Sequence, residues 1–177
     1  YIVLECAKVL HDELPYNLHI FVNSVEFIAK VIDTLKLAPE AVKVVCSTSG
    51  DSRQENQRKL GNAYPIGQPS DPAKKINFYT STCFEGCDIF DPDGVTFIVS
   101  DGRKAHTLLD ISTLFTQICG RIRDSRYKAQ IVHVYSTTKY SNAVTLDEFV
   151  AATQRTLADA EKFASDINAV DEPSREK

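Results

Sequence analysis

Residues 19–35 read HIFVNSVEFIAKVIDTL, a stretch that decides the fold class of this chain. The apolar run from His19 to Val22 is typical of a buried strand. Ser24 is a favoured helix N-cap residue, and the apolar positions after it recur at helical spacing as far as Leu35. A buried strand that leads at once into an amphipathic helix indicates an α/β domain.

The same strand-and-helix alternation continues along the chain. Short runs rich in β-branched or aromatic residues predict strands at residues 41–46, 76–80, 95–99 and 131–135. Helical patterns occupy residues 2–14, 53–60 and 110–119, the last beginning at Asp110 as its cap. This alternation favours a mainly parallel sheet covered on both faces, in which ligands collect at the carboxyl ends of the strands.

Three domain segments follow from these patterns. Residues 1–16 form an entry helix, residues 17–140 the α/β lobe, and residues 141–177 a C-terminal helix with a polar tail. Thr145 and Glu148 form a capping box at the start of that last helix. Residues 61–72 hold five glycines and prolines, which predicts a flexible insertion within the lobe.

Composition bounds the class of protein. With 177 residues, of which 43% are hydrophobic and 25% charged, the chain fits one globular domain and is not a disordered tail. No apolar run is long enough to span a membrane and no leader pattern opens the chain, so we expect a cytoplasmic protein with no membrane partner. The chain has no methionine and opens on Tyr1, which we interpret as the mark of a fragment of a longer protein.

Cysteines and histidines point to no metal site. The five cysteines are an odd number and lack zinc-site spacing, so we expect reduced, mostly buried thiols and no metal. His19 and His133 lie on predicted buried strands, where we expect satisfied core residues rather than catalysts.

Charge is unevenly spread along the chain. Residues 101–128 carry six bases against three acids, whereas residues 147–177 carry eight acids against four bases, and the net charge is −4. The basic stretch is able to face a polyanion, although ordinary surface scatter explains the charges equally well.

The segment richest in chemistry is QICGRIR, residues 117–123. Arg121 and Arg123 carry permanently charged, planar donor groups suited to phosphate, and Gly120 permits a turn beside them. The alternative is that both arginines form ordinary surface ion pairs with Asp124 or with glutamates.

Gln117, Gly120, Arg121 and Arg123 resemble motif VI of superfamily 2 helicases. In that family an arginine finger of motif VI reaches across a cleft to the phosphates of ATP. The common form has one more residue between the arginines, so either Arg121 or Arg123 is the finger. The shorter spacing is similar to that of herpesvirus origin-binding-type helicases.

Two more segments resemble motifs of the same family, in the expected order. Residues 80–89, TSTCFEGCDI, look like motif V. There Thr80 and Ser81 would bond a nucleic-acid phosphate, Gly86 would let the backbone approach closely, and Asp88 would accept from a ribose hydroxyl. Asn23 and Ser24 resemble the motif IV loop that touches the nucleic-acid backbone, although Ser24 also has a simpler role as a helix cap.

The resemblance implies the C-terminal RecA-like lobe of an ATP-dependent helicase or translocase, a three-layer α/β sandwich with a mainly parallel sheet and a C-terminal helix. Gln117, Arg121 and Arg123 would be catalytic, Gly86, Asp88 and Gly120 would contact the nucleotide, and Asn23, Ser24, Thr80 and Ser81 would contact nucleic acid. The expected partners are a first RecA-like lobe of the same protein and a nucleic acid, with DNA favoured over RNA.

No phosphate-binding loop or Asp-Glu box occurs in the chain, so ATP and Mg²⁺ would be held mainly by that first lobe and the isolated chain would be inactive. The alternative function is a non-catalytic α/β domain that binds a nucleotide or a partner.

Overall fold

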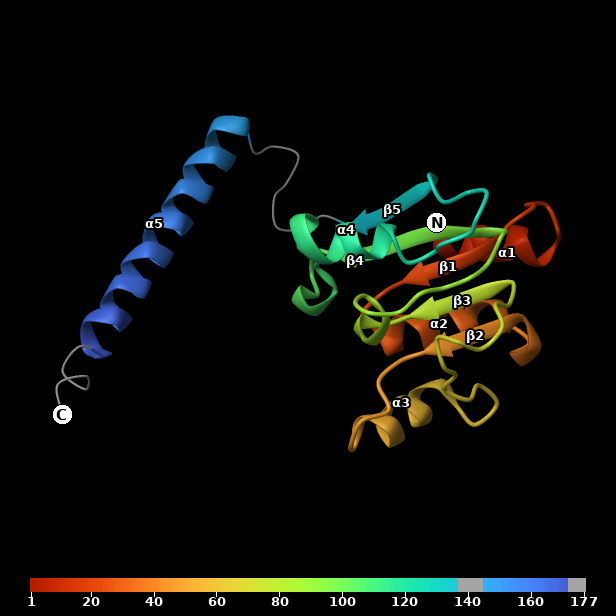
Figure 1. Ribbon diagram of the computed structural model, residues 1–177. Helices are drawn as coiled ribbons and strands as arrows, with labels where there is room; N and C mark the ends of the chain where they lie inside the picture. The colour runs from red at the N-terminus through yellow and green to blue at the C-terminus, as the bar shows by residue number, and fades with distance from the viewer. Residues whose placement is uncertain (137–144, 172–177) are drawn as a thin grey trace. The chain divides into compact units, whose positions relative to one another are not determined.

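The computed structural model describes residues 1–136 and 145–171, which belong to two compact units, residues 1–137 and 138–177. The first unit is built on a five-stranded parallel sheet in the order β2-β3-β1-β4-β5 (Figure 1). The strands are β1 (Asn17–Phe21), β2 (Val42–Val45), β3 (Ile76–Tyr79), β4 (Gly94–Asp101) and β5 (Ile131–Ser136). The predicted α/β class with a parallel sheet is confirmed, and the arrangement is consistent with a RecA-like sandwich.

Helices connect the strands. The α-helices are α1 (Ile2–Leu10), α2 (Val25–Leu35), α3 (Ser52–Leu60), α4 (Thr116–Cys119) and α5 (Leu146–Asp171). Short 3₁₀ turns occupy η1 (Pro39–Ala41), η2 (Ser81–Cys83) and η3 (Ala105–Thr107), and η4 (Ile111–Phe115) is a π-helical turn that runs directly into α4.

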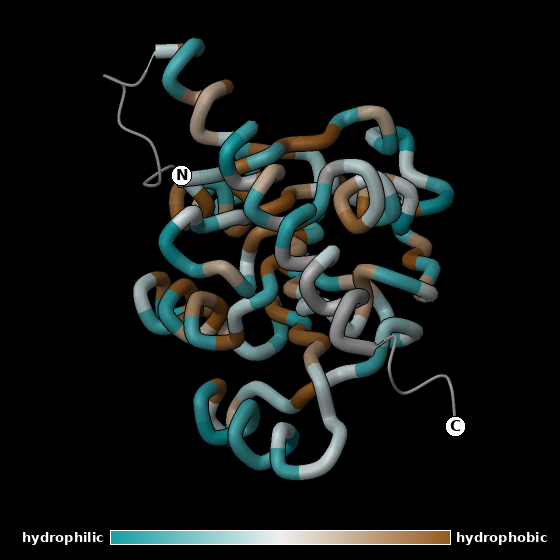
Figure 2. The backbone as a smooth tube through the Cα atoms, turned by 90° about the vertical axis from the view of Figure 1, so that its left-hand side faces the viewer, coloured by the Kyte–Doolittle hydropathy of each residue, from teal (hydrophilic) through white to brown (hydrophobic). Residues whose placement is uncertain are grey.

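The sheet divides the core into two layers because successive side chains of a strand point to opposite faces. Leu18 and Ile20 of β1 pack with α1 and α2 on one face, whereas Phe21 packs with Ile118 of α4 on the other. All four of these side chains are fully buried. Figure 2 shows the hydrophobic residues of the strands inside the first unit and mostly hydrophilic residues in its outer loops.

A polar network lies inside the sheet. His19 is fully buried, and its Nε2 lies 2.8 Å from Oδ2 of Asp91 while its Nδ1 lies 3.1 Å from the hydroxyl of Tyr79. Asn17 donates to the same Asp91 oxygen at 3.0 Å. A Cβ on Gly94 would come within 2.9 Å of the His19 ring, so the network needs glycine there. The prediction that His19 is a satisfied core residue is confirmed.

The prediction for His133 is wrong. Strand β5 pairs with β4 and lies at the end of the strand order, so its side chains are only partly covered. His133 is exposed, and its Nε2 lies 3.2 Å from the hydroxyl of Ser100. The apolar run of β5 looked like a central strand in sequence, because periodicity does not distinguish a central strand from an edge strand.

Two helix boundaries differ from their predictions. The first helix ends at Leu10 instead of residue 14, because Asp12 adopts a left-handed conformation with a φ of 55°. It is also not a separate entry segment, since Cys6 and Val9 are buried in the common core. The helix predicted at residues 110–119 begins as the π-helical turn η4, and Asp110 caps it as expected by accepting from the N–H of Thr113 at 2.9 Å.

The segment of residues 61–72 is tied to the sheet. Ile66 forms a bridge to Val44 of β2, and the N–H of Gly67 donates to the carbonyl of Val44 at 2.8 Å. Lys43, which is buried, donates to the carbonyl of Pro69 at 3.0 Å. The segment predicted as a flexible insertion is therefore attached to β2 by these contacts, because a run of glycines and prolines breaks regular structure without removing the hydrogen bonds of the backbone.

The second unit contains α5. Thr145 and Glu148 form the predicted capping box, since the Thr145 N–H donates to Oε2 of Glu148 at 2.8 Å and the Glu148 N–H donates to the Thr145 hydroxyl at 3.3 Å. The predicted boundary at residues 140 and 141 and the polar tail from residue 172 lie outside the described residues. Within the described part of the chain, no helix combines the length and the apolar character needed to cross a bilayer.

Candidate functional site

The carboxyl ends of β1, β2 and β3 meet at a polar pocket of about 340 Å³. All three strands are parallel, so the loops that follow them lie at one edge of the sheet. The residues that line the pocket come from these loops, from α2 and α3 and from η3: Asn23, Ser24, Val25, Glu26, Ser47, Asn56, Lys59, Thr80, Ser81 and His106. The four residues expected to contact nucleic acid therefore lie around one pocket.

Asn23 joins three loops of this pocket. Its side-chain Oδ1 accepts from the N–H of Ser81 at 3.3 Å, and its Nδ2 donates to the carbonyl of His106 at 2.8 Å. The loops after β1, β3 and β4 are thus linked by one amide side chain. Asn23 shapes the pocket wall, a role that the sequence did not indicate.

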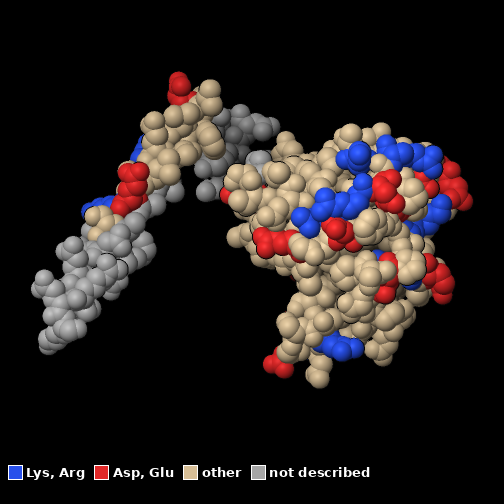
Figure 3. All heavy atoms as spheres, viewed as in Figure 1, with Lys and Arg blue, Asp and Glu red and all other residues tan. Residues whose placement is uncertain are grey.

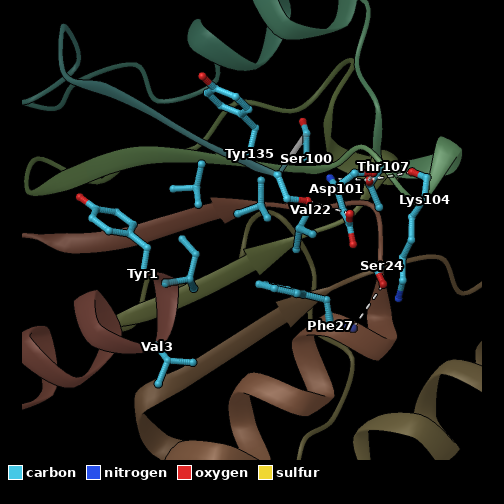
Figure 4. A pocket seen from close by; sticks show the side chains of 14 residues that line it. Tyr1, Val3, Val22, Ser24, Phe27, Ser100, Asp101, Lys104, Thr107 and Tyr135 are labelled. Atoms are coloured by element: carbon cyan, nitrogen blue, oxygen red, sulfur yellow. Dashed lines mark hydrogen bonds between the residues drawn. The ribbon is translucent and has the colours of Figure 1, made fainter. Parts of the chain in front are cut away.

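Ser24 is the N-cap of α2 and a wall residue at the same time. Its hydroxyl accepts from the N–H of Phe27 at 3.2 Å, and only 8% of the residue is exposed. Ser24 also lines a second pocket, of about 260 Å³, between the start of α1, the start of α2 and the ends of β4 and β5 (Figure 4). Apolar side chains, among them Val22 and Phe27, form much of that second pocket.

Thr80 and Ser81 differ in access. Thr80 is 5% exposed, and its hydroxyl lies 3.5 Å from that of Thr82. Ser81 is exposed at the start of η2. Of the two hydroxyls expected to reach a phosphate, that of Ser81 is the more accessible one, because Thr80 is buried.

Lys59 and Asn56 are pocket residues that the sequence analysis did not single out. Both lie on α3, which was predicted only as a charged surface helix. Asn56 donates to the carbonyl of Ser47 at 3.0 Å, which fixes α3 against the loop after β2. Lys59 forms an exposed ion pair with Glu55 at 2.6 Å. No motif in the sequence marks these two residues as part of a site.

The segment that resembles motif VI lies beside the segment that resembles motif V. Ile89 and Ile122 form a parallel bridge, in which the Ile89 N–H donates to the carbonyl of Arg121 at 2.9 Å and the Arg123 N–H donates to the carbonyl of Ile89 at 3.0 Å. Both isoleucines are buried. Two segments that the sequence separates by more than thirty residues are therefore held in register by their backbones.

The two arginines have intramolecular partners. Arg121 donates from Nε to the carbonyl of Gln117 at 2.9 Å and from a terminal nitrogen to the carbonyl of Cys87 at 3.2 Å. Arg123 donates from Nε to Oδ1 of Asp88 at 2.7 Å, and half of each of these two side chains is exposed. Asp88, expected to accept from a ribose hydroxyl, thus pairs with Arg123, and the carboxylate that pairs with Arg123 is not that of Asp124.

The glycines of these segments are not equivalent. Gly86 has a φ of 74°, a conformation that side chains disfavour. Gly120 has a φ of −95°, and a Cβ placed there would lie 3.6 Å from the carbonyl oxygen of Gln117, an ordinary contact. The backbone conformation of the turn beside the arginines therefore does not require glycine at position 120. The side chain of Gln117 is exposed at the same helix.

The basic stretch of residues 101–128 is largely neutralised. Four of its six bases form ion pairs: Arg103 with Asp101, Lys104 with Glu26, Arg123 with Asp88 and Arg126 with Asp93. Figure 3 shows Lys and Arg side chains interleaved with Asp and Glu on the face of the first unit turned to the viewer. Long-range attraction of a polyanion by this stretch is accordingly weak.

All five cysteines are free thiols, and Cys6, Cys46 and Cys83 are buried. Burial raises the pKa of the Cys46 thiol to about 11, so it is protonated at neutral pH. Among the described residues, no group of three or more potential ligands is placed to hold a metal ion.

Comparisons of the chain with models of known families, with curated proteins and with solved structures find no match.

Proposed function

We propose that this chain is the C-terminal motor lobe of an ATP-dependent nucleic-acid helicase or translocase, joined in the intact protein to a first lobe that holds ATP and Mg²⁺. The observation that carries the proposal is the convergence of Asn23, Ser24, Thr80 and Ser81 on one polar pocket at the carboxyl edge of a parallel sheet. These residues belong to two segments far apart in the chain that resemble successive helicase motifs.

The pocket supports contact with a sugar-phosphate backbone. It offers the exposed hydroxyl of Ser81, the N-terminal end of α2 and the ammonium group of Lys59. Backbone N–H groups at a helix N-terminus favour anions, and hydroxyls and lysines bond phosphate oxygens without reading base identity. The expected recognition is therefore independent of sequence and weakens with salt.

The arginine segment supports the nucleotide side of the proposal. Because the backbone of Arg121 and Arg123 is hydrogen-bonded to that of Ile89, any movement of the lobe carries the two segments that resemble motifs V and VI together. ATP would supply the phosphoryl group and this lobe a guanidinium that stabilises charge on it. Coupled opening and closing of two lobes would then become stepping along a strand. The 177-residue chain alone should not hydrolyse ATP.

A second candidate function is a non-catalytic α/β domain that binds a nucleotide or a protein partner. The observation that favours it is that both arginines already have partners within the chain. The two candidate functions differ in the expected ligand of the pocket near Lys59. Only the motor lobe requires that nucleic acid binds there.

Binding of fluorescein-labelled single-stranded DNA and RNA oligonucleotides, measured by fluorescence anisotropy at several salt concentrations, tests the proposal. Lys59→Glu should weaken binding about tenfold at low salt and reduce the salt slope by about 1, since one phosphate contact is lost. The matched control is Lys75→Glu. Lys75 forms an exposed ion pair with Asp12 and precedes β3, at the opposite edge of the sheet.

At about 0.15 M salt the control should bind within about twofold of the unchanged chain, because the Debye length is then about 8 Å and more distant surface charges are screened. Equal losses of affinity in Lys59→Glu and Lys75→Glu would mean that binding follows net charge alone. Absence of binding to any oligonucleotide would contradict the proposed contact of this pocket with nucleic acid.

A further inference from the structure

The two arginines of the segment at residues 121–123 are bound in different ways. Arg121 is half-buried and donates to two backbone carbonyls, those of Gln117 in α4 and of Cys87 in the neighbouring segment. Arg123 is exposed and donates to a single carboxylate, that of Asp88. Arg121 thus donates to neutral acceptors that are fixed in the backbone, whereas Arg123 donates to an anionic acceptor that is exposed to solvent.

The backbone fixes where both side chains can go. Ile122 is buried and bridges to Ile89, so the residues on either side of it, Arg121 and Arg123, lie on the opposite, outward side of the segment. They differ in their exposure and in their partners.

Exchange of partners is costly for one arginine and easy for the other. If Arg121 turned away, the carbonyls of Gln117 and Cys87 would lose charge-assisted donors, and part of the connection between α4 and the neighbouring segment would be lost. The carboxylate of Asp88 is half exposed, so water replaces Arg123 readily when the guanidinium leaves. A phosphate, like a carboxylate, offers the guanidinium of Arg123 anionic oxygens that accept charge-assisted hydrogen bonds.

We propose that Arg123 is the arginine that meets the nucleotide phosphates, that Asp88 holds its guanidinium in place until a phosphate displaces the carboxylate, and that Arg121 is a positioning residue that clasps α4 to residue 87. This inference rests on the proposed function and decides between the two arginines that the sequence left equal. Asp88 acts as an intramolecular competitor of the phosphate.

A first experiment uses pyrophosphate as the probe and the 177-residue chain. Two-dimensional NMR of the arginine Nε–Hε groups follows each guanidinium during a pyrophosphate titration. The Arg123 resonance should move with added pyrophosphate, and the Arg121 resonance should move little. Asp88→Asn should tighten pyrophosphate binding about two- to fivefold, the range expected when an exposed competing ion pair is removed.

Asp93→Asn is the matched control. Asp93 forms an ion pair with Arg126 on the same connection, and its removal should leave pyrophosphate binding at Arg123 unchanged. Movement of Arg121 before Arg123, or equal affinity in Asp88→Asn and the unchanged chain, would overturn the proposal.

A second experiment uses the intact protein and separates kcat from KM for ATP. Arg123→Gln should lower kcat about a thousandfold, the lower end of the effect of an arginine finger, with the melting temperature nearly unchanged. Arg121→Gln should lower the melting temperature and reduce kcat by a much smaller factor, and Arg121→Lys should recover part of both. Arg126→Gln, which breaks an ion pair outside the site, should leave kcat unchanged.

Negative results of the two experiments contradict different claims. If the intact protein hydrolyses no ATP, the proposed function is wrong, while the pyrophosphate titration still decides which arginine exchanges its partner. If ATP is hydrolysed but Arg121→Gln abolishes turnover and Arg123→Gln does not, the proposed motor function is retained. The assignment of different roles to the two arginines is then overturned.

Discussion

Asn23 accepts a hydrogen bond from the N–H of Ser81, 58 positions further along the chain, at 3.3 Å. The same side chain donates to the carbonyl of His106 at 2.8 Å, so one amide holds together the loops after three strands. The two segments that resemble motifs IV and V are thus one structural unit, and the pocket between them depends on a residue whose expected role was only direct contact.

Asn23→Ala should lower the free energy of unfolding by about 1 kcal/mol, since two partly exposed hydrogen bonds are lost. Urea denaturation followed by circular dichroism measures this change. Asn23→Asp keeps the acceptor for Ser81 but loses the donor to His106. Its free energy of unfolding should therefore lie between those of the unchanged chain and Asn23→Ala. A stability of Asn23→Ala equal to that of the unchanged chain would show that the amide does not hold the loops.

Substitutions at Ser24 separate its two roles. Ser24→Ala removes the cap of α2 and should cost about 1 kcal/mol of stability. Ser24→Asp restores an N-cap acceptor but places a carboxylate in the pocket, so stability should recover while affinity for oligonucleotides falls severalfold. Parallel urea and anisotropy measurements check this. If Ser24→Asp binds as well as the unchanged chain, no phosphate approaches the start of α2.

Three glycine-to-alanine changes have different expected costs. Gly94→Ala should destabilise the chain by about 1–3 kcal/mol, because its Cβ would lie 2.9 Å from the His19 ring inside the core. Gly86→Ala should cost about 1 kcal/mol for its left-handed backbone. Gly120→Ala should fold as well as the unchanged chain. Urea denaturation ranks the three, and a large loss of stability at Gly120 would contradict the geometry of this turn.

Acid should destabilise the fold in part through Asp91. Burial alone would raise the pKa of this carboxyl, but hydrogen bonds from His19 and Asn17 outweigh it and hold the pKa below its ordinary value of 3.8. A lowered pKa stabilises the fold above the unfolded value, and this contribution is lost as the pH falls below 3.8 through the folded value. Asp91→Asn should therefore lose stability at neutral pH and show a flatter decline between about pH 5 and 2. Identical acid slopes would mean that Asp91 titrates normally.

Sequence reasoning predicted the parallel α/β fold well because strand and helix patterns are local. Residues 19–35 formed the expected strand and helix, with Ser24 as the cap. It failed where the outcome depended on non-local packing. The position of β5 at the edge of the sheet, which exposes His133, depends on strand order, and no periodicity encodes strand order.

The candidate site shows the same division. The order of the segments at residues 23–24, 80–88 and 117–123 was visible in sequence, and the first two meet at one pocket. The pairing of Arg123 with Asp88 was not predictable, because it depends on a backbone bridge between Ile89 and Ile122. Lys59 was missed since its helix follows a different strand and carries no recognisable motif.

ATP hydrolysis by the intact protein, with this chain joined to its expected first lobe, tests the central claim most directly. The double variant Arg121→Ala and Arg123→Ala should reduce nucleic-acid-stimulated turnover at least about a thousandfold while ATP binding stays measurable, because a guanidinium that stabilises transition-state charge has been removed. Undiminished turnover in the double variant would contradict the assignment of this chain as the lobe that supplies the arginine finger.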